Sequence, residues 1–173
     1  QKYLNKQEAL LKEVADLLKN PKDLKQAVSQ LINDKNDLQK ALEKEYQQKS
    51  GALKDDLLKA AEDKNGVATI IKQIKLPNAD SLKKLSFELK NEKDQLFVVL
   101  ACDIQGKPQI AVTISDNLVK TKDLNAGHII RELAKHIQGG GGGQPFFATA
   151  GGNNLAGLSE VVKAAEEIAS NKL

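Results

Sequence analysis

The residues with the clearest chemical potential are five consecutive glycines, Gly139 to Gly143, which stand between a helical pattern and a short apolar run. Without a Cβ, their backbone N–H groups can approach a phosphate closely and form a concave anion site. Glycine costs about 0.5 to 1 kcal/mol relative to alanine in regular structure, so a run of five requires an explanation. The alternative explanation is a flexible loop that joins a helix to a strand.

Two cations precede the glycine run on the same predicted helix. Arg131 and Lys135 are four residues apart, so they are neighbours on one helical face. The backbone of Gly141, Gly142 and Gly143 and these two cations could therefore converge on one phosphate-rich surface. The alternative is that both side chains are simply solvated and that the glycines let a strand pass near the helix. A second candidate set of cations lies elsewhere in the sequence, at Lys72, Lys75, Lys83, Lys84 and Lys107.

The glycine run fits neither common nucleotide-binding motif. A P-loop requires Gly-Lys-Ser/Thr at the start of a helix, but here Gln144-Pro145-Phe146 follows the glycines. A dinucleotide-binding fingerprint follows a strand and opens a helix, whereas this run follows a helix and opens a strand. Both nucleotide-binding classes are therefore excluded for this segment.

The glycine run and its flanks carry a family resemblance. Residues 124–158, LNAGHIIRELAKHIQGGGGGQPFFATAGGNNLAGL, resemble the C-terminal module of alanyl-tRNA synthetases, which also occurs beside DHH phosphoesterase domains. The shared signature is a glycine cluster, a basic residue, proline, and a small or apolar strand that ends in Ala-Gly-Gly. The sequence departs from it at four positions, where the family usually has Gly, Arg or Lys, Asp and Gln: Gln138, Gln144, Phe146 and Thr149.

The resemblance implies a tRNA-binding and tethering module that grips the outer corner of the tRNA and joins the aminoacylation and editing domains. It implies that this chain is non-catalytic and that its parent is an ATP-dependent alanine–tRNA ligase in the cytoplasm. ATP and zinc would bind only in other domains of that parent, so no cofactor is expected here. The implied partners are alanine-specific tRNA and the other synthetase domains, with no membrane.

Other potentially catalytic or metal-binding residues form no recognisable constellation. His128 and His136 are eight residues apart on a predicted helix, about 80° apart around its axis, without a third ligand at useful spacing. Cys102 lies within an apolar run, where burial raises the pKa of a thiol and makes it inert. Asp103 follows at the end of the same run, where a turn-forming role is as reasonable as that of a base.

Composition limits the functional classes. The 173 residues have a net charge of +3, which is too small to indicate nucleic-acid binding by itself. The single cysteine excludes an internal disulfide and favours a reducing compartment. No apolar run reaches the 18 residues of a membrane span. The absence of methionine predicts that the sequence is part of a longer protein.

The first 66 residues predict a helical arm. Their apolar residues recur at helical spacing, and the Asn20-Pro21 pair separates two helices. The charge-rich faces around this narrow stripe are typical of a helical hairpin or a coiled-coil-like arm. A break near residues 47–51 and a helix stop at Asn65-Gly66 are also predicted. The stripe consists of Leu4, Leu11, Val14, Leu18, Leu24, Val28, Leu31, Leu38, Leu42, Leu53 and Leu57.

Residues 67–173 predict a small globular domain. Strand-length apolar runs replace the helical periodicity after Gly66, and the fold class is α+β with helices packed on a mixed sheet. The run 95–104 is typical of a central strand that is covered on both faces. The predicted order is strand 67–74, helix 81–90, strands 95–104 and 109–115, helix 125–138, strand 146–150 and helix 154–168.

Three functions are compatible with the sequence. The first is the tRNA-binding module that the resemblance implies. The alternative is an oligomerisation module whose helical arm pairs with a second copy, without decisive RNA contacts. A third, which no resemblance supports, is a small anion-binding enzyme that uses the glycine run. Salt-sensitive tRNA affinity would distinguish the first, and a molecular mass that depends on the arm would distinguish the second.

Overall fold

The computed structural model describes residues 2–173; the side chains at positions 2, 4 and 5, among them Leu4 of the predicted stripe, lie outside the described part. It confirms an α+β fold in which a long helix is followed by a six-stranded mixed sheet. The elements in chain order are α1 (Lys2–Leu17), α2 (Leu24–Lys59), β1 (Glu62–Lys64), β2 (Val67–Lys75), α3 (Ala79–Lys90), β3 (Leu96–Ile104), β4 (Lys107–Ile114), α4 (Asp116–Thr121), α5 (Ala126–Leu133), β5 (Gly140–Gln144), β6 (Phe147–Gly151), the 3-10 turn η1 (Leu155–Gly157) and α6 (Leu158–Lys172).

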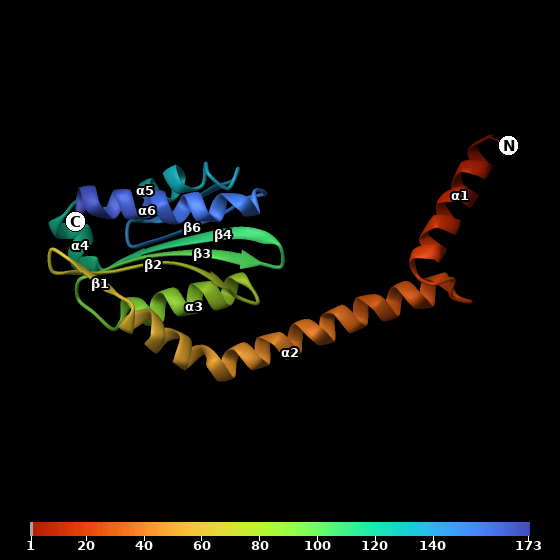
Figure 1. Ribbon diagram of the computed structural model, residues 1–173, viewed down its shortest axis with the longest axis horizontal. Coiled ribbons are helices and arrows are strands. Elements are labelled where there is room, and N and C mark those ends of the chain that lie inside the picture. Colours follow the sequence, from red (N-terminus) through yellow and green to blue (C-terminus); the bar gives the residue numbers. More distant parts are fainter. Residues whose placement is uncertain (1) are drawn as a thin grey trace. The chain divides into compact units, whose positions relative to one another are not determined.

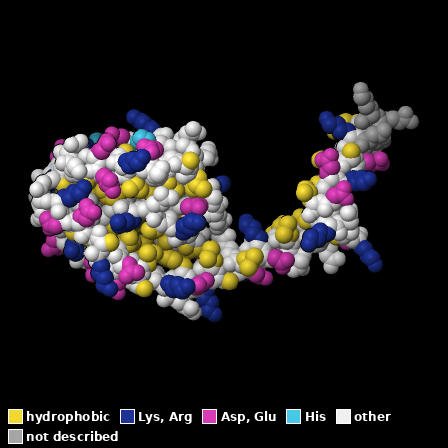
Figure 2. Space-filling model, in the orientation of Figure 1, with side chains coloured by type: hydrophobic (Ala, Val, Ile, Leu, Met, Phe, Trp, Pro, Cys, Tyr) yellow, Lys and Arg dark blue, Asp and Glu magenta, His cyan; other side chains and the backbone are white. Residues whose placement is uncertain are grey.

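The chain divides into two compact units, the first ending at Lys44 and the second running from Glu45 to Leu173. The first unit contains α1 and the beginning of α2. The α2 helix begins at Leu24, after Pro21, because the Asp23 carboxylate accepts a hydrogen bond from the Gln26 backbone N–H at 2.9 Å. Large apolar side chains of this unit are exposed to solvent (Figure 2): Leu10, Leu11, Leu17, Val28, Leu31, Ile32, Leu38 and Leu42.

The C-terminal turns of α2 belong to the second unit. The helix continues through Gly51, where a break was predicted, and buries Leu57 in the core of the second unit. Tyr46, Leu53 and Leu58 pack against the same core. The compact unit therefore begins before the sequence switches from helical to strand periodicity, and a domain boundary at Gly66 stays a prediction.

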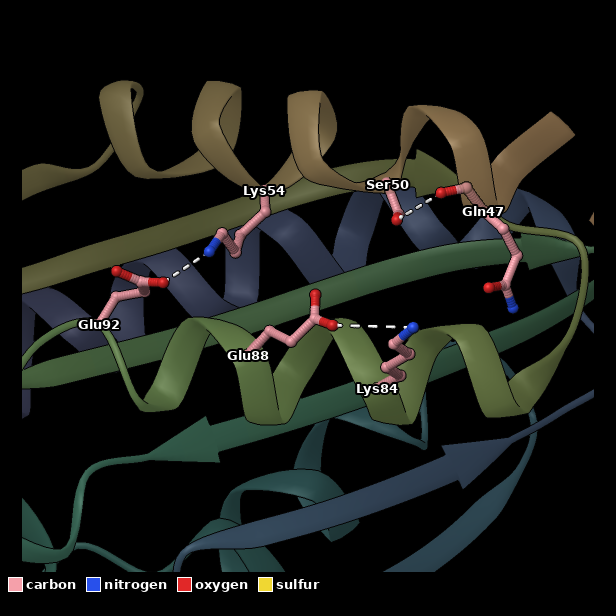
Figure 3. A network of polar contacts seen from close by, with 6 residues as sticks. All are labelled: Gln47, Ser50, Lys54, Lys84, Glu88 and Glu92. Carbon is pink, nitrogen blue, oxygen red and sulfur yellow. Dashed lines mark hydrogen bonds and ion pairs between the residues drawn. The ribbon is translucent and has the colours of Figure 1, made fainter. Parts of the chain in front are cut away.

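Polar contacts join the end of α2 to α3 (Figure 3). Lys54 Nζ lies 2.6 Å from Glu92 Oε1, between α2 and the turn after α3. On α3, Lys84 lies 3.9 Å from Glu88 on the face toward α2. These contacts lie at the rim of an apolar interface, so they orient the helices while apolar burial supplies most of the stability.

The Lys54–Glu92 pair should contribute modestly to stability. In a double-mutant cycle with Lys54→Ala and Glu92→Ala, we expect the effects of the two single changes to be nearly additive, because both side chains remain partly solvated. Urea unfolding of the four proteins would measure these effects. A clear departure from additivity would show that the pair is more important than its exposure suggests.

The sheet has the strand order β1-β2-β3-β4-β6-β5. Only β2 and β3 are parallel, and α3 provides the crossover that such a pair requires. Asn65-Gly66 is a hairpin turn between β1 and β2, which corrects the predicted helix stop. Both residues have positive φ, 54° and 83°, as the tightest hairpin turns require.

Helices cover the two faces of the sheet unequally (Figure 1). Helix α6 lies over β2 and β3, and α5 lies on the same face over β4, β6 and β5. On the opposite face, α3 lies over β3 and β4. The strand β3 is consequently buried on both faces, as its continuous apolar run predicted. Within residues 2–173, no helix is both long and apolar enough to cross a membrane.

Candidate functional site

Four of the five glycines, Gly140 to Gly143, lie on the strand β5, which corrects the interpretation of the run as a flexible loop. The strand β5 pairs antiparallel with β6, with Gly142 opposite Thr149. It is the last strand of the sheet, so one edge of its backbone has no neighbouring strand among the described residues. Most of its residues are exposed to solvent. The candidate site is therefore a glycine edge strand, in which bare backbone is held in a fixed position.

Alternate glycines of the run are required by the hairpin itself. A Cβ on Gly139, Gly141 or Gly143 would lie 2.0 to 2.3 Å from a backbone carbonyl oxygen of β6. No side chain fits such a distance, because real Cβ atoms essentially never come within 3.0 Å of another heavy atom. These three glycines therefore allow the two strands to approach each other.

The other glycines of the hairpin have no such packing role. A Cβ on Gly140, Gly142 or Gly151 would meet no atom within 4 Å. Gly140 pairs with Gly151, and both lie on the same side of the sheet as the exposed Thr149. We call the surface formed by Gly140, Gly142, Thr149 and Gly151 the open face; it lies opposite α5.

Helix α5 holds the other side of the hairpin. Gly127 faces the carbonyl oxygen of Gly143, at 3.1 Å from the position of a Cβ. The Ala126 N–H donates to Pro145 O at 2.8 Å, and the Gly139 N–H donates to Ala134 O at 3.0 Å. These contacts fix both ends of the glycine strand against the helix.

Arg131 lies on the flank of α5 that faces the glycine strand. It is one helical turn after Gly127, which touches the strand, and Lys135 is one turn later in the segment that closes the helix. Both side chains are exposed, and neither forms an ion pair with another described residue. The structure thus brings the predicted cations and glycines to one edge of the sheet, with solvent around them.

Aromatic side chains fix the tip of the hairpin. The ring centroids of Phe147 and Phe87 of α3 are 4.8 Å apart. Lys90 Nζ lies 4.4 Å from the centre of the Phe146 ring and 2.8 Å from an oxygen of Asp116. The same lysine therefore connects the hairpin to both α3 and α4, a helix that the sequence pattern does not predict.

The second candidate set of cations is spread over several elements. Its lysines lie on β2, α3 and β4, and all five are exposed. Lys84 pairs with Glu88, while Lys83 and Lys107 have no ion-pair partner in the described part of the chain.

The remaining side chains that could take part in chemistry are those of Asp103, His128, His136 and Cys102. The Asp103 carboxylate accepts the Gly106 N–H at 2.9 Å and so forms the turn after β3. His128 is exposed on α5 and His136 is half-buried after it. Among residues 2–173, no group of three or more His, Cys, Asp or Glu side chains could hold a metal ion. Cys102 is buried in β3, and desolvation raises the pKa of its thiol to about 12.

The Cys102 thiol should be inert in the folded protein. At pH 8 its labelling by a disulfide reagent should be on the order of a thousandfold slower than in the unfolded chain, because the thiolate is the reactive form. Labelling with and without denaturant would measure this difference. Rapid labelling of the fully folded protein would contradict the burial of β3.

Fold and site together define a class of small α+β domain whose sheet ends in a glycine hairpin that packs on a short helix. The chain belongs to the DHHA1 domain family, which matches residues 66–171. It is 42% identical over 166 residues to an alanine–tRNA ligase of Cytophaga hutchinsonii and 43% identical over 165 residues to that of Christiangramia forsetii. These alignments cover 96% and 95% of this chain but only 19% of each relative, so the chain spans about a fifth of their length.

Solved structures show the same fold. The C-Ala domain of alanyl-tRNA synthetase from Aquifex aeolicus matches with a TM-score of 0.57 at 25% identity, over 64% of this chain and 97% of that domain. A DHH-domain protein described as a member of a family of ribosomal proteins matches with a TM-score of 0.50 at 16% identity, over 74% of this chain and 32% of its own. The second likeness concerns the fold alone.

Proposed function

We propose that the chain is a C-terminal tRNA-binding and tethering module of an alanyl-tRNA synthetase. In this proposal it contacts the outer corner of alanine-specific tRNA and links the aminoacylation and editing domains of a cytoplasmic, ATP-dependent ligase. The chemistry, with its ATP and zinc, belongs to those other domains. The aminoacylation reaction would therefore take place in those other domains, and this chain would bind and orient the tRNA.

The observation that carries the proposal is the exposed glycine strand beside two unpaired cations, in a chain that aligns almost completely with alanine–tRNA ligases. A folded RNA corner presents phosphates, 2′-hydroxyls and few base edges, so bare backbone and cations suit it. Gly141, Gly142, Gly143, Arg131 and Lys135 form the proposed contact surface. Gln144 provides no charge at the tip of the strand, so Arg131 and Lys135 carry the electrostatic contribution.

A gel-shift titration with an alanine tRNA transcript tests this function directly. The protein should bind the transcript with an affinity that falls as salt is raised, because phosphate contacts release counterions. Light scattering on the same samples would report the stoichiometry. Absence of salt-sensitive binding at micromolar protein would refute the proposal.

We propose self-association through the helical arm as a second property of the chain. Leu17 is 84% exposed and Leu38 is 72% exposed, although both lie on helices whose stability depends on burying one apolar face. This property is compatible with RNA binding. The alternative function, oligomerisation without decisive RNA contacts, leaves the glycine strand and the two cations without a role.

We expect a concentration-dependent dimer in sedimentation equilibrium. Replacement of both Leu31 and Leu38 by lysine should raise the dissociation constant of the dimer by about a thousandfold or more, since a dimer would bury four such leucines at about 1.5 to 3 kcal/mol each. If the unaltered protein sediments as a monomer at high micromolar concentration while the arm remains helical, self-association is refuted.

A further inference from the structure

The tip of the glycine hairpin is held from two directions. We call residues 144–147, where β5 turns into β6, the hairpin tip. On one side, Pro145 O accepts the N–H of Ala126, the first residue of α5, at 2.8 Å. On the other side, the ring of Phe147 packs on Phe87 of α3. The position of the hairpin tip therefore sets both the end of the glycine strand and the start of the helix beside it.

Lys90 is the charged group at the hairpin tip. Its Nζ lies 4.4 Å from the centre of the Phe146 ring and 2.8 Å from Asp116 Oδ1. The lysine side chain is 15% exposed, whereas that of Asp116 is 67% exposed. A cation is attracted to the face of an aromatic ring, and the attraction is stronger where water is largely excluded. The contact with Phe146 should therefore hold the hairpin tip more firmly than the ion pair, which solvent screens.

Packing alone does not fix the Lys90 side chain. A surface hollow of about 380 Å³ adjoins it, between the end of α3 and the start of α4. The lysine therefore has room to turn away from the hairpin tip, and its contacts with the Phe146 ring and the Asp116 carboxylate keep it there. The same space can accommodate the guanidinium group of arginine, which also stacks on aromatic faces.

A buried hydroxyl without a hydrogen-bond partner lies under the hairpin tip. Thr113 of β4 is directly opposite Phe147 of β6, so the two side chains share one face of the sheet. Thr113 is 1% exposed, and its Oγ1 has no hydrogen-bond partner among the described residues. Such a group costs free energy that is recovered when water reaches it. This cost favours opening of the hairpin tip, so the closed tip depends on the contacts that Lys90 makes.

We infer that Lys90 is a positioning residue for RNA binding, which keeps the glycine strand and α5 in their binding arrangement by holding the Phe146 ring. The inference rests on the proposed RNA-binding function. Lys90 is largely buried and its charge is directed at the ring and at Asp116, so it makes no phosphate contact. It raises the fraction of molecules in which the binding surface is already formed, and the apparent affinity for RNA is proportional to that fraction.

Two substitutions of Lys90 test the inference. Lys90→Gln removes the charge and keeps a residue that suits a helix. It should lower the affinity for an alanine tRNA transcript by about 2- to 30-fold, the factor that corresponds to a lost cation–π contact. Because no phosphate contact is lost, the slope of log affinity against log salt should change by less than about half a unit. Lys90→Arg keeps the cation and its stacking on the ring, so it should restore most of the affinity.

Hydrogen exchange of the protein without RNA measures the opening of the hairpin itself. Lys90→Gln should speed the exchange of the β5 and β6 amides by about 2- to 30-fold and leave the β3 amides unchanged. Thr113→Val should slow exchange in β5 and β6, because it removes the unpartnered hydroxyl and keeps the shape of the side chain. Lys172→Gln is the matched control, since Lys172 is an exposed lysine of α6 without an ion-pair partner among the described residues. It should change neither exchange nor affinity.

The outcomes separate this inference from the proposed function. If the unaltered protein binds the transcript and Lys90→Gln binds it equally well, the function stands and Lys90 has no positioning role. A salt slope that falls by about one in Lys90→Gln would identify Lys90 as a phosphate contact instead. Failure of Lys90→Arg to restore affinity, or faster exchange in Thr113→Val as well, would show that the hairpin tip responds to any change in its packing. If the unaltered protein does not bind the transcript, the proposed function fails and the inference fails with it.

Discussion

Replacement of Gly141 by valine should disrupt the edge hairpin, at a cost on the order of 3 to 5 kcal/mol in the free energy of unfolding. The Cβ of any larger residue at this position would lie 2.2 Å from the carbonyl oxygen of Thr149 and 2.5 Å from the Cβ of Ala150. Both atoms belong to β6, which is held by β4 on its other side. The strands would have to separate, and the contact between Gly127 and Gly143 would be lost with them.

Gly142→Val is the matched control for this prediction. The same side chain at the next position meets no atom within 4 Å, so it should change the free energy of unfolding by less than about 1 kcal/mol. Urea unfolding of the two variants measures the contrast. Equal destabilisation by both, or by neither, would contradict the alternation of packed and open glycines along β5.

Removal of the two cations beside the glycine strand should weaken tRNA binding and flatten its salt dependence. For the double variant Arg131→Ala, Lys135→Ala we expect the slope of log affinity against log salt to fall by roughly one to two, because each lost phosphate contact removes about 0.7 to 0.9. At low salt this corresponds to a loss of affinity of about tenfold or more. Filter binding across a salt series would measure both quantities.

The control must remove the same charge from another surface. Lys120 and Lys172 are exposed lysines on α4 and α6, without ion-pair partners among the described residues. Their double replacement by alanine lowers the net charge equally but should leave the slope within about half a unit of the parent value. If the two double variants behave alike, binding responds only to overall charge and the phosphate contacts lie elsewhere. The remaining lysines of β2, α3 and β4 would then be the leading candidates.

Much of the fold could be predicted from the sequence because its core strands carry strong local signals. The apolar run that forms β3 and the periodic leucines of α3 were assigned correctly within one or two residues. The glycine strand was not, because glycine has no side chain to alternate and no strand propensity. The register with β6, which holds β5 in place, comes from the tertiary structure.

The residues of the candidate site could be predicted from the sequence. The division of its glycines into packed and open positions could not. Arg131, Lys135 and the glycine run emerged from residue spacing and family resemblance. Which glycines are packed and which are open depends on the pairing of Gly141 with Ala150 and of Gly142 with Thr149, and no spacing rule gives that pairing. Asn-Gly is typical both of a tight hairpin turn and of a helix end, and the long helical pattern before Asn65-Gly66 favours the helix end.

The order of the strands has a consequence for how the domain folds. Neighbours β3 and β4 are joined by a tight turn, whereas β6 reaches β4 only after α4 and α5 have been made, so that Val112 meets Ala148. Pairings between distant parts of a chain close slowly, because the intervening loop must first lose its freedom. We therefore expect the glycine hairpin to join the sheet last during folding and to open first in hydrogen exchange. An RNA bound across this hairpin would then stabilise the part of the domain that forms last and opens first.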